Sequence, residues 1–283
     1  NDKKGATNKK PVETLPPPAR VVIPMSLHIG APCTPCVSVG DEVTVGQKVG
    51  EAPAFVSAPV HASISGKVSA VEPRIHFSGV PVMSVVIEND FNETPCPSLT
   101  PAPDPDDLTP EQLSAIIKEA GIVGMGGATF PTHVKITSGL GKVDTVIVNA
   151  CECEPYITSD HRVLLEEPEA VLGGVRLLAR IFGVDRVHIA IEQNKANAAG
   201  MLKLKIEEEK APAVVDVLPT RYPQGAEKQL CQSITGRQVP PGALPAAIGC
   251  AVFNVVTTVA IYNAVYHGKP VTHRVVTVSG SGV

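Results

Sequence analysis

A glycine-rich loop is the first place in the sequence where residue types and spacing suggest chemistry. Gly124, Gly126 and Gly127 fall within one short run, and Lys135 follows them. Because glycine has no Cβ, such a backbone approaches an anion closely and directs several N–H groups at it. A nearby lysine supplies the positive charge that a phosphate needs. The run follows a helix and lacks the G-x-G-x-x-G spacing of dinucleotide-binding turns, so alone it fits an anion-binding loop or a tight turn.

Three further polar clusters come directly after expected strands or at the start of expected helices. They are Asn149, Cys151, Glu152 and Glu154; Tyr222, Gly225 and Glu227; and Asn254 and Thr258. Open parallel sheets bind ligands beyond the carboxyl ends of their strands. The clusters are therefore candidates for a binding site at that end of a sheet.

The elements that must position these residues alternate between strand and helix. Thr109 and Gln112 form a capping box with Pro110 between them, which predicts a helix that ends at Gly121. Strands are expected at 145–148, 187–191, 214–218 and 274–278, and helices at 171–182, 196–209, 227–234 and 255–266. This alternation predicts a Rossmann-like α/β domain over 111–272, with a parallel sheet covered on both faces.

The first third of the chain has a different pattern. Short β-branched runs punctuated by Gly and Pro occur at 21–23, 37–39, 43–45, 64–71 and 82–87, without a helical period. They predict a small all-β module over 19–92. Residues 1–18 are interpreted as a tail, the proline-rich stretch 93–110 as a linker at a domain boundary, and 273–283 as the start of a following domain.

Composition excludes several classes of protein. With 43% hydrophobic and 18% charged residues among 283, the chain is not intrinsically disordered. A net charge of −4 and 4% aromatic residues give no signature of nucleic-acid binding. Seven cysteines, an odd number, favour reduced thiols over a secreted disulfide scaffold. No signal peptide is visible, and prolines and polar residues interrupt the uncharged run 238–266, which favours a buried helix over a membrane span.

Two segments of the β module resemble the halves of a biotinyl/lipoyl-type barrel-sandwich hybrid. They are residues 37–50 and 58–68, with Gly-Asp and Ser-Gly turns between short strands. A carrier of this type bears a lysine at the hairpin tip between the halves, and residues 51–57 contain none. A structural or docking role is therefore favoured over a cofactor carrier.

Taken together, the polar clusters resemble the FMN and NADH site of the flavoprotein subunit of respiratory NADH dehydrogenase. The resemblance is closer to the C subunits of Rnf electron-transport complexes, for which residues 22–32 and 222–225 are typical. It covers nearly the whole chain and implies an electron-transfer flavoprotein. Hydride would be exchanged between NADH and FMN, and single electrons would pass to iron–sulfur clusters outside this chain. The complex would be an ion-pumping ferredoxin:NAD oxidoreductase.

The resemblance also implies a role for each candidate residue. The residues implied for FMN are Gly124, Gly126, Gly127, Lys135, Asn149, Cys151, Glu152, Tyr222, Gly225, Glu227, Asn254 and Thr258, and those for NADH are Phe130, Glu152 and Glu154. Lys135 would bind the FMN phosphate, Phe130 would stack on the adenine, and Glu154 would receive the nicotinamide carboxamide. No side chain is expected to act as a general acid or base, and no metal site is expected. The sequence departs from the respiratory relatives at Cys151, where they have aspartate, and at Ser138, where they have an aromatic residue.

The implied partners are the other subunits of a membrane-bound complex, with this chain peripheral on the cytoplasmic face of a bacterial membrane. None of the seven cysteines forms the C-x₂-C-x₂-C-x₃-C-P run of ferredoxin-type clusters, and Cys33 and Cys36 are interpreted as incidental thiols. Iron–sulfur clusters are therefore expected only in a C-terminal part that follows this chain. Two alternatives stay open: a related cobalamin reductase, and a non-enzymatic docking subunit with decayed flavin loops.

Overall fold

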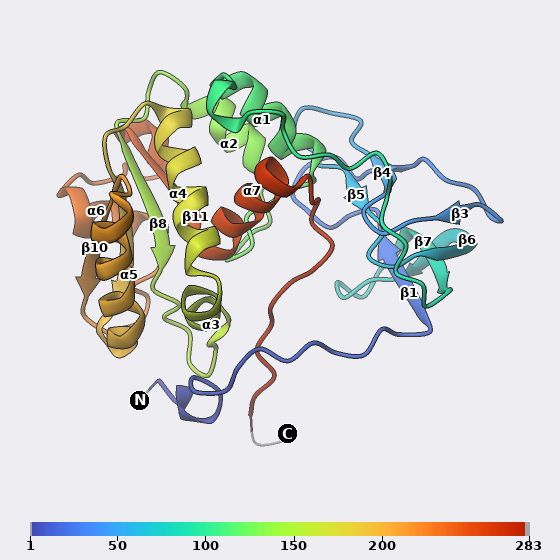
Figure 1. Ribbon diagram of the computed structural model, residues 1–283, viewed down its shortest axis with the longest axis horizontal. Helices are drawn as coiled ribbons and strands as arrows, with labels where there is room; N and C mark the ends of the chain where they lie inside the picture. The colour runs from blue at the N-terminus through green and yellow to red at the C-terminus, as the bar shows by residue number, and fades with distance from the viewer. Residues whose placement is uncertain (1, 281–283) are drawn as a thin grey trace. The chain divides into compact units, whose positions relative to one another are not determined.

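The computed structural model describes residues 2–280, and its ribbon is drawn in Figure 1. The chain forms two compact units. The unit that we call the α/β unit contains residues 2–13, 136–262 and 275–280 of the described chain. The β unit contains residues 14–135 and 263–274. The expectations for residue 1 and for residues 281–283, which belong to the expected tail and to the expected following domain, lie outside the described residues.

A parallel sheet forms the centre of the α/β unit, as the sequence predicts. Its strands are β8 (Thr145–Ala150), β9 (Val187–Glu192), β10 (Ala213–Leu218) and β11 (Cys250–Asn254), in the order β10-β9-β8-β11. The three strand pairs are all parallel, with Val146 opposite Val187 and Asn149 opposite Asn254. Because β9 and β11 lie on opposite sides of β8, the strand order reverses at β8. That reversal is where open α/β sheets form ligand crevices.

Helices connect these strands, and both faces of the sheet carry apolar side chains. The helices are α3 (Ser159–Glu166), α4 (Pro168–Phe182), α5 (Ala196–Glu209), α6 (Glu227–Thr235) and α7 (Val255–His267), with short 3₁₀ turns η3 (Gln193–Lys195) and η4 (Pro245–Ile248). On one face, Ile147 and Val252 pack against Leu230 and Cys231 of α6. In Figure 1, α4 runs alongside β8. The predicted helices at 171–182, 196–209, 227–234 and 255–266 are confirmed to within three residues at each end.

Two adjacent glycines let α4 approach α7 closely. A Cβ built on Gly174 would lie 2.2 Å from the carbonyl oxygen of Thr258, and one on Gly173 would lie 2.2 Å from the Tyr262 ring. Contacts this short do not occur between real atoms, so this crossing requires glycine at both positions. It fixes the first turns of α7, which follow the carboxyl end of β11.

The β unit contains two small antiparallel sheets. One has the order β1 (Arg20–Pro24), β7 (Pro81–Asn89), β6 (Gly66–Ile75) and β3 (Glu42–Val43); the other has β2 (Thr34–Pro35), β4 (Lys48–Glu51) and β5 (Val60–His61). Their shared core includes Met25, Val49, Val68 and Val85. Cys33 belongs to this core, whereas Cys36 is exposed.

Three further helices lie between β7 and β8 in the chain. The short helix η2 (Pro105–Asp107) precedes α1 (Pro110–Glu119), and α2 (Thr132–Gly139) follows the glycine-rich loop. The predicted capping box of α1 is confirmed. The Thr109 Oγ1 accepts the Gln112 N–H at 3.3 Å, and Gln112 Oε1 accepts the Thr109 N–H at 2.8 Å.

Two predicted strands are wrong. The stretch 274–278 is rich in β-branched residues, but none of its side chains is buried, and no strand of the described sheets pairs with it. β-Branched residues stabilise a strand only when they pack against neighbouring strands and the backbone finds a partner. The stretch 37–39 likewise forms no strand, because a turn ends it. The Asp41 carboxylate accepts the Ser38 N–H, and Gly40 has φ +100°.

The uncharged run contains more structure than the single buried helix that its composition suggests. Asn254 divides it into β11 and α7, since the Asn254 Oδ1 accepts the N–H groups of Val256 and Thr257 at the start of the helix. Helices α2 and α3 were also not predicted. Among residues 2–280, no helix has both the length and the apolar character required to cross a bilayer.

The domain boundaries expected from the sequence stay predictions. The compact units divide the chain differently, because α1 and the glycine-rich loop belong to the β unit and residues 2–13 belong to the α/β unit.

Candidate functional site

The glycine-rich loop lies in the β unit, between α1 and α2. Its backbone is closed by a hydrogen bond from the Gly124 N–H to the Phe130 carbonyl at 2.9 Å, and the Arg274 side chain donates to the carbonyl of Met125. Gly126 and Gly127 are exposed. A Cβ added at Gly127 would have no described atom within 4 Å, and the φ of Gly127 is not positive. Neither packing nor backbone conformation therefore requires glycine at 127, which fits a loop that an external group approaches closely.

Lys135 follows this loop in the first turn of α2. Its neighbour His133 is buried and anchors the segment, because the ring Nε2 lies 2.9 Å from the Phe55 carbonyl oxygen and the ring packs edge-on against Phe55. Burial lowers the pKa of His133, and the Phe55 contact opposes this shift. Phe130 and Lys135 are both partly buried. The β unit thus holds the loop glycines, Phe130 and Lys135 on one anchored segment.

A second part of the candidate site lies in the α/β unit, at the carboxyl end of β8. The Asn149 Nδ2 donates to the carbonyl of Gly225 at 2.8 Å, and the Asn149 Oδ1 accepts the Cys151 N–H at 3.1 Å. The Gly225 N–H lies 3.4 Å from the Cys153 sulfur. A Cβ at Gly225 would lie within 3.5 Å of Asn149, Cys151 and Cys153. These contacts bring two clusters that are distant in sequence into one, as expected for loops at one end of a parallel sheet.

Cys151 points into the protein core. Its side chain has no exposed surface, it packs with Ile147 and Leu230, and its sulfur lies 3.5 Å from the Ala190 carbonyl oxygen. Burial raises the pKa of this thiol to about 12, so the side chain is a neutral thiol at physiological pH. Any contact of Cys151 with a ligand would have to come from its backbone.

Glu152 and Asn254 are linked through Asp160, a residue that the sequence did not single out. The Glu152 carboxylate accepts the N–H groups of Asp160 at 2.6 Å and His161 at 3.4 Å, so it caps α3 where Thr158 makes no side-chain cap bond. The Asn254 Nδ2 donates to the Asp160 carboxylate at 2.7 Å. Burial, together with the Glu152 charge, raises the pKa of Asp160 to about 7, and burial also raises the pKa of Glu152.

The remaining predicted site residues of the α/β unit differ in their solvent exposure. Glu154, Tyr222 and Glu227 are exposed, and 72% of Tyr222 is accessible. Thr258 is completely buried at the α4–α7 crossing, and its hydroxyl donates to the Asn254 carbonyl at 3.0 Å. Glu154 and Tyr222 are thus available to a ligand, whereas the Thr258 side chain supports Asn254.

A buried ion pair supports this cluster from beneath. Lys195 and Glu192 have no exposed surface, and the Lys195 Nζ lies 3.6 Å from Glu192 Oε2. The ammonium also donates to the carbonyl of Cys151, and Glu192 Oε1 accepts the Arg221 N–H at 3.1 Å. Burial raises the pKa of Glu192. The pair therefore ties the chain after β8 to the segment before Tyr222.

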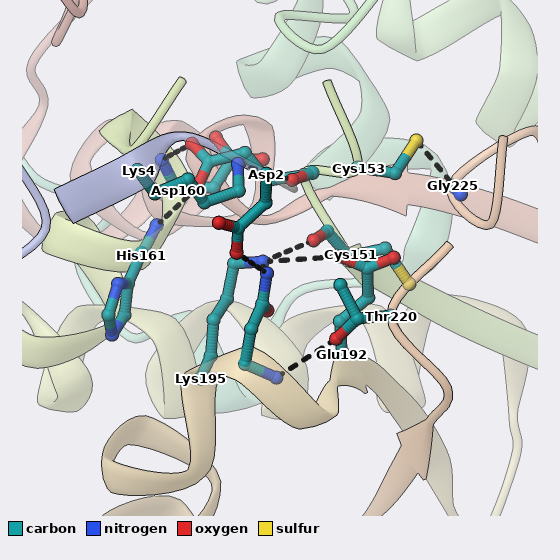
Figure 2. Close-up of polar contacts among 12 residues, drawn as sticks. Asp2, Lys4, Cys151, Cys153, Asp160, His161, Glu192, Lys195, Thr220 and Gly225 are labelled. Carbon is teal, nitrogen blue, oxygen red and sulfur yellow. Dashed lines mark hydrogen bonds and ion pairs between the residues drawn. The ribbon is translucent and has the colours of Figure 1, made fainter. Parts of the chain in front are cut away.

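A residue of the expected tail also reaches this cluster. Lys4, in the short helix η1 (Lys4–Ala6), is buried, and its ammonium donates to backbone carbonyls of the loop after β8. Figure 2 shows Asp2, Lys4 and Lys195 converging on the chain between Cys151 and Asp160. Sequence reasoning missed Lys4, Asp160, Glu192 and Lys195, because a lone charged residue gives no signal until the fold buries it.

These residues suit a flavin nucleotide. The glycine-rich loop and Lys135 offer backbone N–H groups and positive charge for a phosphate. The Asn149 side chain is bonded to Gly225, Tyr222 is exposed three residues earlier in the chain, and a Cβ at 225 would lie 3.4 Å from the Cys153 sulfur. Within the β unit, the loop donors and Lys135 suit a phosphate group, and within the α/β unit, Tyr222 offers an exposed aromatic ring.

Comparisons with known proteins give two family matches. Residues 117–263 match the model described as the Nuo51 FMN-binding domain. Residues 1–92 match the model described as the RnfC barrel sandwich hybrid domain.

Curated relatives match nearly the whole chain. The C subunit of the Na⁺-translocating ferredoxin:NAD⁺ oxidoreductase complex of Acetobacterium woodii is 48% identical over 99% of this chain and 63% of the relative. The C subunit of the proton-translocating ferredoxin:NAD⁺ oxidoreductase complex of Clostridium ljungdahlii is 44% identical over 100% of this chain and 62% of the relative. The C subunit of the ion-translocating oxidoreductase complex of Vibrio cholerae is 40% identical over 99% of this chain and 36% of the relative.

Solved structures of similar fold include an NAD⁺-reducing NiFe hydrogenase in its H₂-reduced state. The match has a TM-score of 0.52 at 26% identity and covers 59% of this chain and 33% of that chain. The air-oxidised hydrogenase matches with the same TM-score.

Proposed function

The chain belongs to the family of the Nuo51 FMN-binding domain, with an RnfC barrel sandwich hybrid domain before it, and on this premise we propose that it is an FMN-binding, NADH-dependent electron-transfer subunit. The observation that carries the proposal is the glycine at position 127. It is exposed, and neither packing nor a positive φ requires it. A loop of this kind serves a ligand that needs close contact with backbone N–H groups.

The residues that would hold FMN are those that the resemblance implies. Gly124, Gly126, Gly127 and Lys135 would bind the phosphate, and Asn149, Gly225 and Tyr222 would lie beside the isoalloxazine ring. Glu227 and Asn254 would complete the site. Cys151 would contribute its backbone, and Thr258 would act by supporting Asn254.

NADH would be held by Phe130, Glu152 and Glu154. Glu154 is exposed and would receive the nicotinamide carboxamide. Glu152 is turned inward to cap α3, so it would act through the shape and charge of the loop. When bound, FMN supplies hydride acceptance and single-electron release, and the protein supplies orientation and charge. No side chain of the chain needs to move a proton for hydride transfer.

The function of the whole protein is a further proposal, because the chain spans 36–63% of the length of the three curated relatives described above. Those relatives are named as subunits of ion-translocating ferredoxin:NAD⁺ or related oxidoreductase complexes. We infer that electrons leave the flavin for iron–sulfur clusters outside this chain, and that the chain works with other subunits at the cytoplasmic face of a bacterial membrane.

The test is a visible spectrum of the purified chain after incubation with FMN, before and after anaerobic addition of NADH. We expect flavin absorbance that stays with the protein through gel filtration and bleaches on NADH addition. Failure to retain FMN at high concentration would refute the proposal and favour a docking subunit with decayed flavin loops. Retention of FMN without bleaching would refute the NADH-dependent part alone.

A further inference from the structure

The N-terminal segment 2–8, which we call the strap, lies across the loop that follows β8. Asp2 and Thr7 lie at or near its two ends. The carbonyl of Asp2 accepts the Tyr156 N–H at 2.9 Å, and the hydroxyls of Thr7 and Thr158 lie 2.8 Å apart. The Asp2 carboxylate also accepts from the Asn194 side chain at 2.9 Å, which fastens the strap to the turn after β9.

Lys4 is the centre of the strap. Its ammonium donates to the backbone carbonyls of Glu152 at 2.8 Å and Glu154 at 2.9 Å, and also to that of Ile157. An ammonium has three protons, and here all three are bound by carbonyls of one loop. The side chain is buried, with 3% of its surface exposed. Lys4 therefore organises these carbonyls as a bound cation would.

The loop needs such support, because its own backbone forms no helix or strand. Residues 151–158 contain two non-glycine residues with positive φ, Glu152 at +46° and Tyr156 at +70°. This conformation is costly for residues with a side chain and persists where the surroundings impose it. The strap bonds the carbonyl of Glu152 and the N–H of Tyr156 directly.

Fixing the backbone here also sets the place from which one exposed side chain extends. Glu154 has its carbonyl held by Lys4 while its carboxylate faces solvent. We propose that the strap is a positioning element for the dinucleotide, with Lys4 as the residue that holds Glu154 in place for NADH. This inference rests on the proposed function, since it gives Glu154 the role described there.

The test replaces Lys4 by methionine, which keeps the length and apolar body of the side chain and removes the ammonium. In the full chain loaded with FMN, Lys4→Met is expected to raise the KM for NADH about tenfold in ferricyanide reduction, which corresponds to about 1.4 kcal/mol. The kcat and the affinity for FMN are expected to stay within about twofold. Lys10→Met, at an exposed lysine of the N-terminal segment, is the matched control and should leave the KM unchanged.

Hydrogen exchange gives a second readout that does not depend on FMN. The amides of 152–158 are expected to exchange faster in Lys4→Met than in the unmodified protein and in Lys10→Met. An unchanged exchange rate, or an unchanged KM in an FMN-loaded Lys4→Met protein, would overturn the inference. Retention of FMN by the unmodified protein tests the proposed function separately, so the two failures are distinguishable.

Discussion

At the scale of single residues, the candidate site depends on charged groups that the fold removes from water. Asp160, Glu152 and Glu192 all have a raised pKa because they are buried, and Lys4 has a lowered pKa for the same reason. Charges in such places need partners, since burying an unpaired charge is costly. Lys4 bonds carbonyls of the loop after β8, and Glu152 bonds N–H groups of α3. Asp160 is bonded by the Asn254 side chain, and Glu192 by Lys195 and the Arg221 N–H.

Asp160 gives a prediction about pH. Its pKa is about 7 in the folded chain and near 3.8 when unfolded, so the folded state binds the proton more tightly between these values. The contribution of Asp160 to the free energy of unfolding therefore falls as pH rises from about 4 to about 7. Removing the charge should therefore stabilise the folded state most above about pH 7. As the pH is raised from 5 to 8, the free energy of unfolding of Asp160→Asn is expected to increase by at least about 1 kcal/mol relative to that of the unmodified protein.

The measurement is urea unfolding of both proteins at the two pH values. The buried histidines have lowered pKa values, so their contribution to the free energy of unfolding changes with pH in the opposite direction. This contribution is the same in both proteins, so it cancels when the two are compared. Asp185→Asn, at an exposed position, is the control. If the Asp160→Asn profile runs parallel to the unmodified one, the buried carboxyl does not titrate as proposed.

At the scale of elements, the α4–α7 crossing positions the end of β11. Thr258 is fixed between Gly174 and the Asn254 carbonyl, and Asn254 caps α7 while it binds Asp160. A helix that moved outward at this crossing would carry Asn254 with it. The small residues of α4 are therefore part of the architecture of the site.

The close α4–α7 crossing predicts that alanine substitutions at two helical glycines change the stability in opposite directions. Gly174→Ala places a methyl group 2.2 Å from the Thr258 carbonyl oxygen and is expected to cost about 1–3 kcal/mol of unfolding free energy by overpacking. Gly200→Ala in α5 meets no described atom within 4 Å and should stabilise by roughly 0.5–1 kcal/mol through helix propensity. The free energies of unfolding of both variants are measured by urea unfolding at one pH. If the two substitutions change the stability equally, the α4–α7 crossing is looser than described.

At the scale of the whole molecule, the expected relationship to the C subunits of Rnf complexes is confirmed by relatives that match 99–100% of the chain. The expected fold class is confirmed as well, with a barrel sandwich hybrid domain before an FMN-binding α/β domain. The candidate residues are distributed over both compact units, with the glycine-rich loop in one and Asn149 and Gly225 in the other.

Ligand binding gives the prediction at this scale. A ligand at a hundred times its Kd stabilises the folded state by about 2.7 kcal/mol, so FMN should raise the Tm of the chain. If Lys135 binds the phosphate as proposed, Lys135→Ala would remove a charge-assisted contact, and it is expected to weaken FMN binding about tenfold or more and to reduce the Tm shift at fixed FMN.

The Tm shift is taken relative to each protein without FMN, so that any effect of Lys135→Ala on the fold itself is separated from its effect on binding. Lys142→Ala, at an exposed lysine, should behave like the unmodified protein in FMN affinity and in Tm shift. A Lys135→Ala protein with unchanged FMN affinity would remove Lys135 from the proposed site.

Local signals in the sequence were enough to predict several elements. The capping box at Thr109 fixed the start of α1, and continuous apolar runs fixed β8 and β9 as buried strands. The motif types also identified the family and the set of candidate residues. These features are readable because the capping bonds and the periodic burial that cause them lie within a few residues of one another.

Long-range packing, in contrast, decides which candidates face a ligand and which groups hold them. Cys151 and Thr258 match the pattern by position, but packing turns their side chains inward. Lys4 meets the loop after β8 from a distant part of the chain, and the strand expected at 274–278 has no pairing partner in the described sheets. Burial and pairing between distant segments depend on the whole fold, so no local pattern records them.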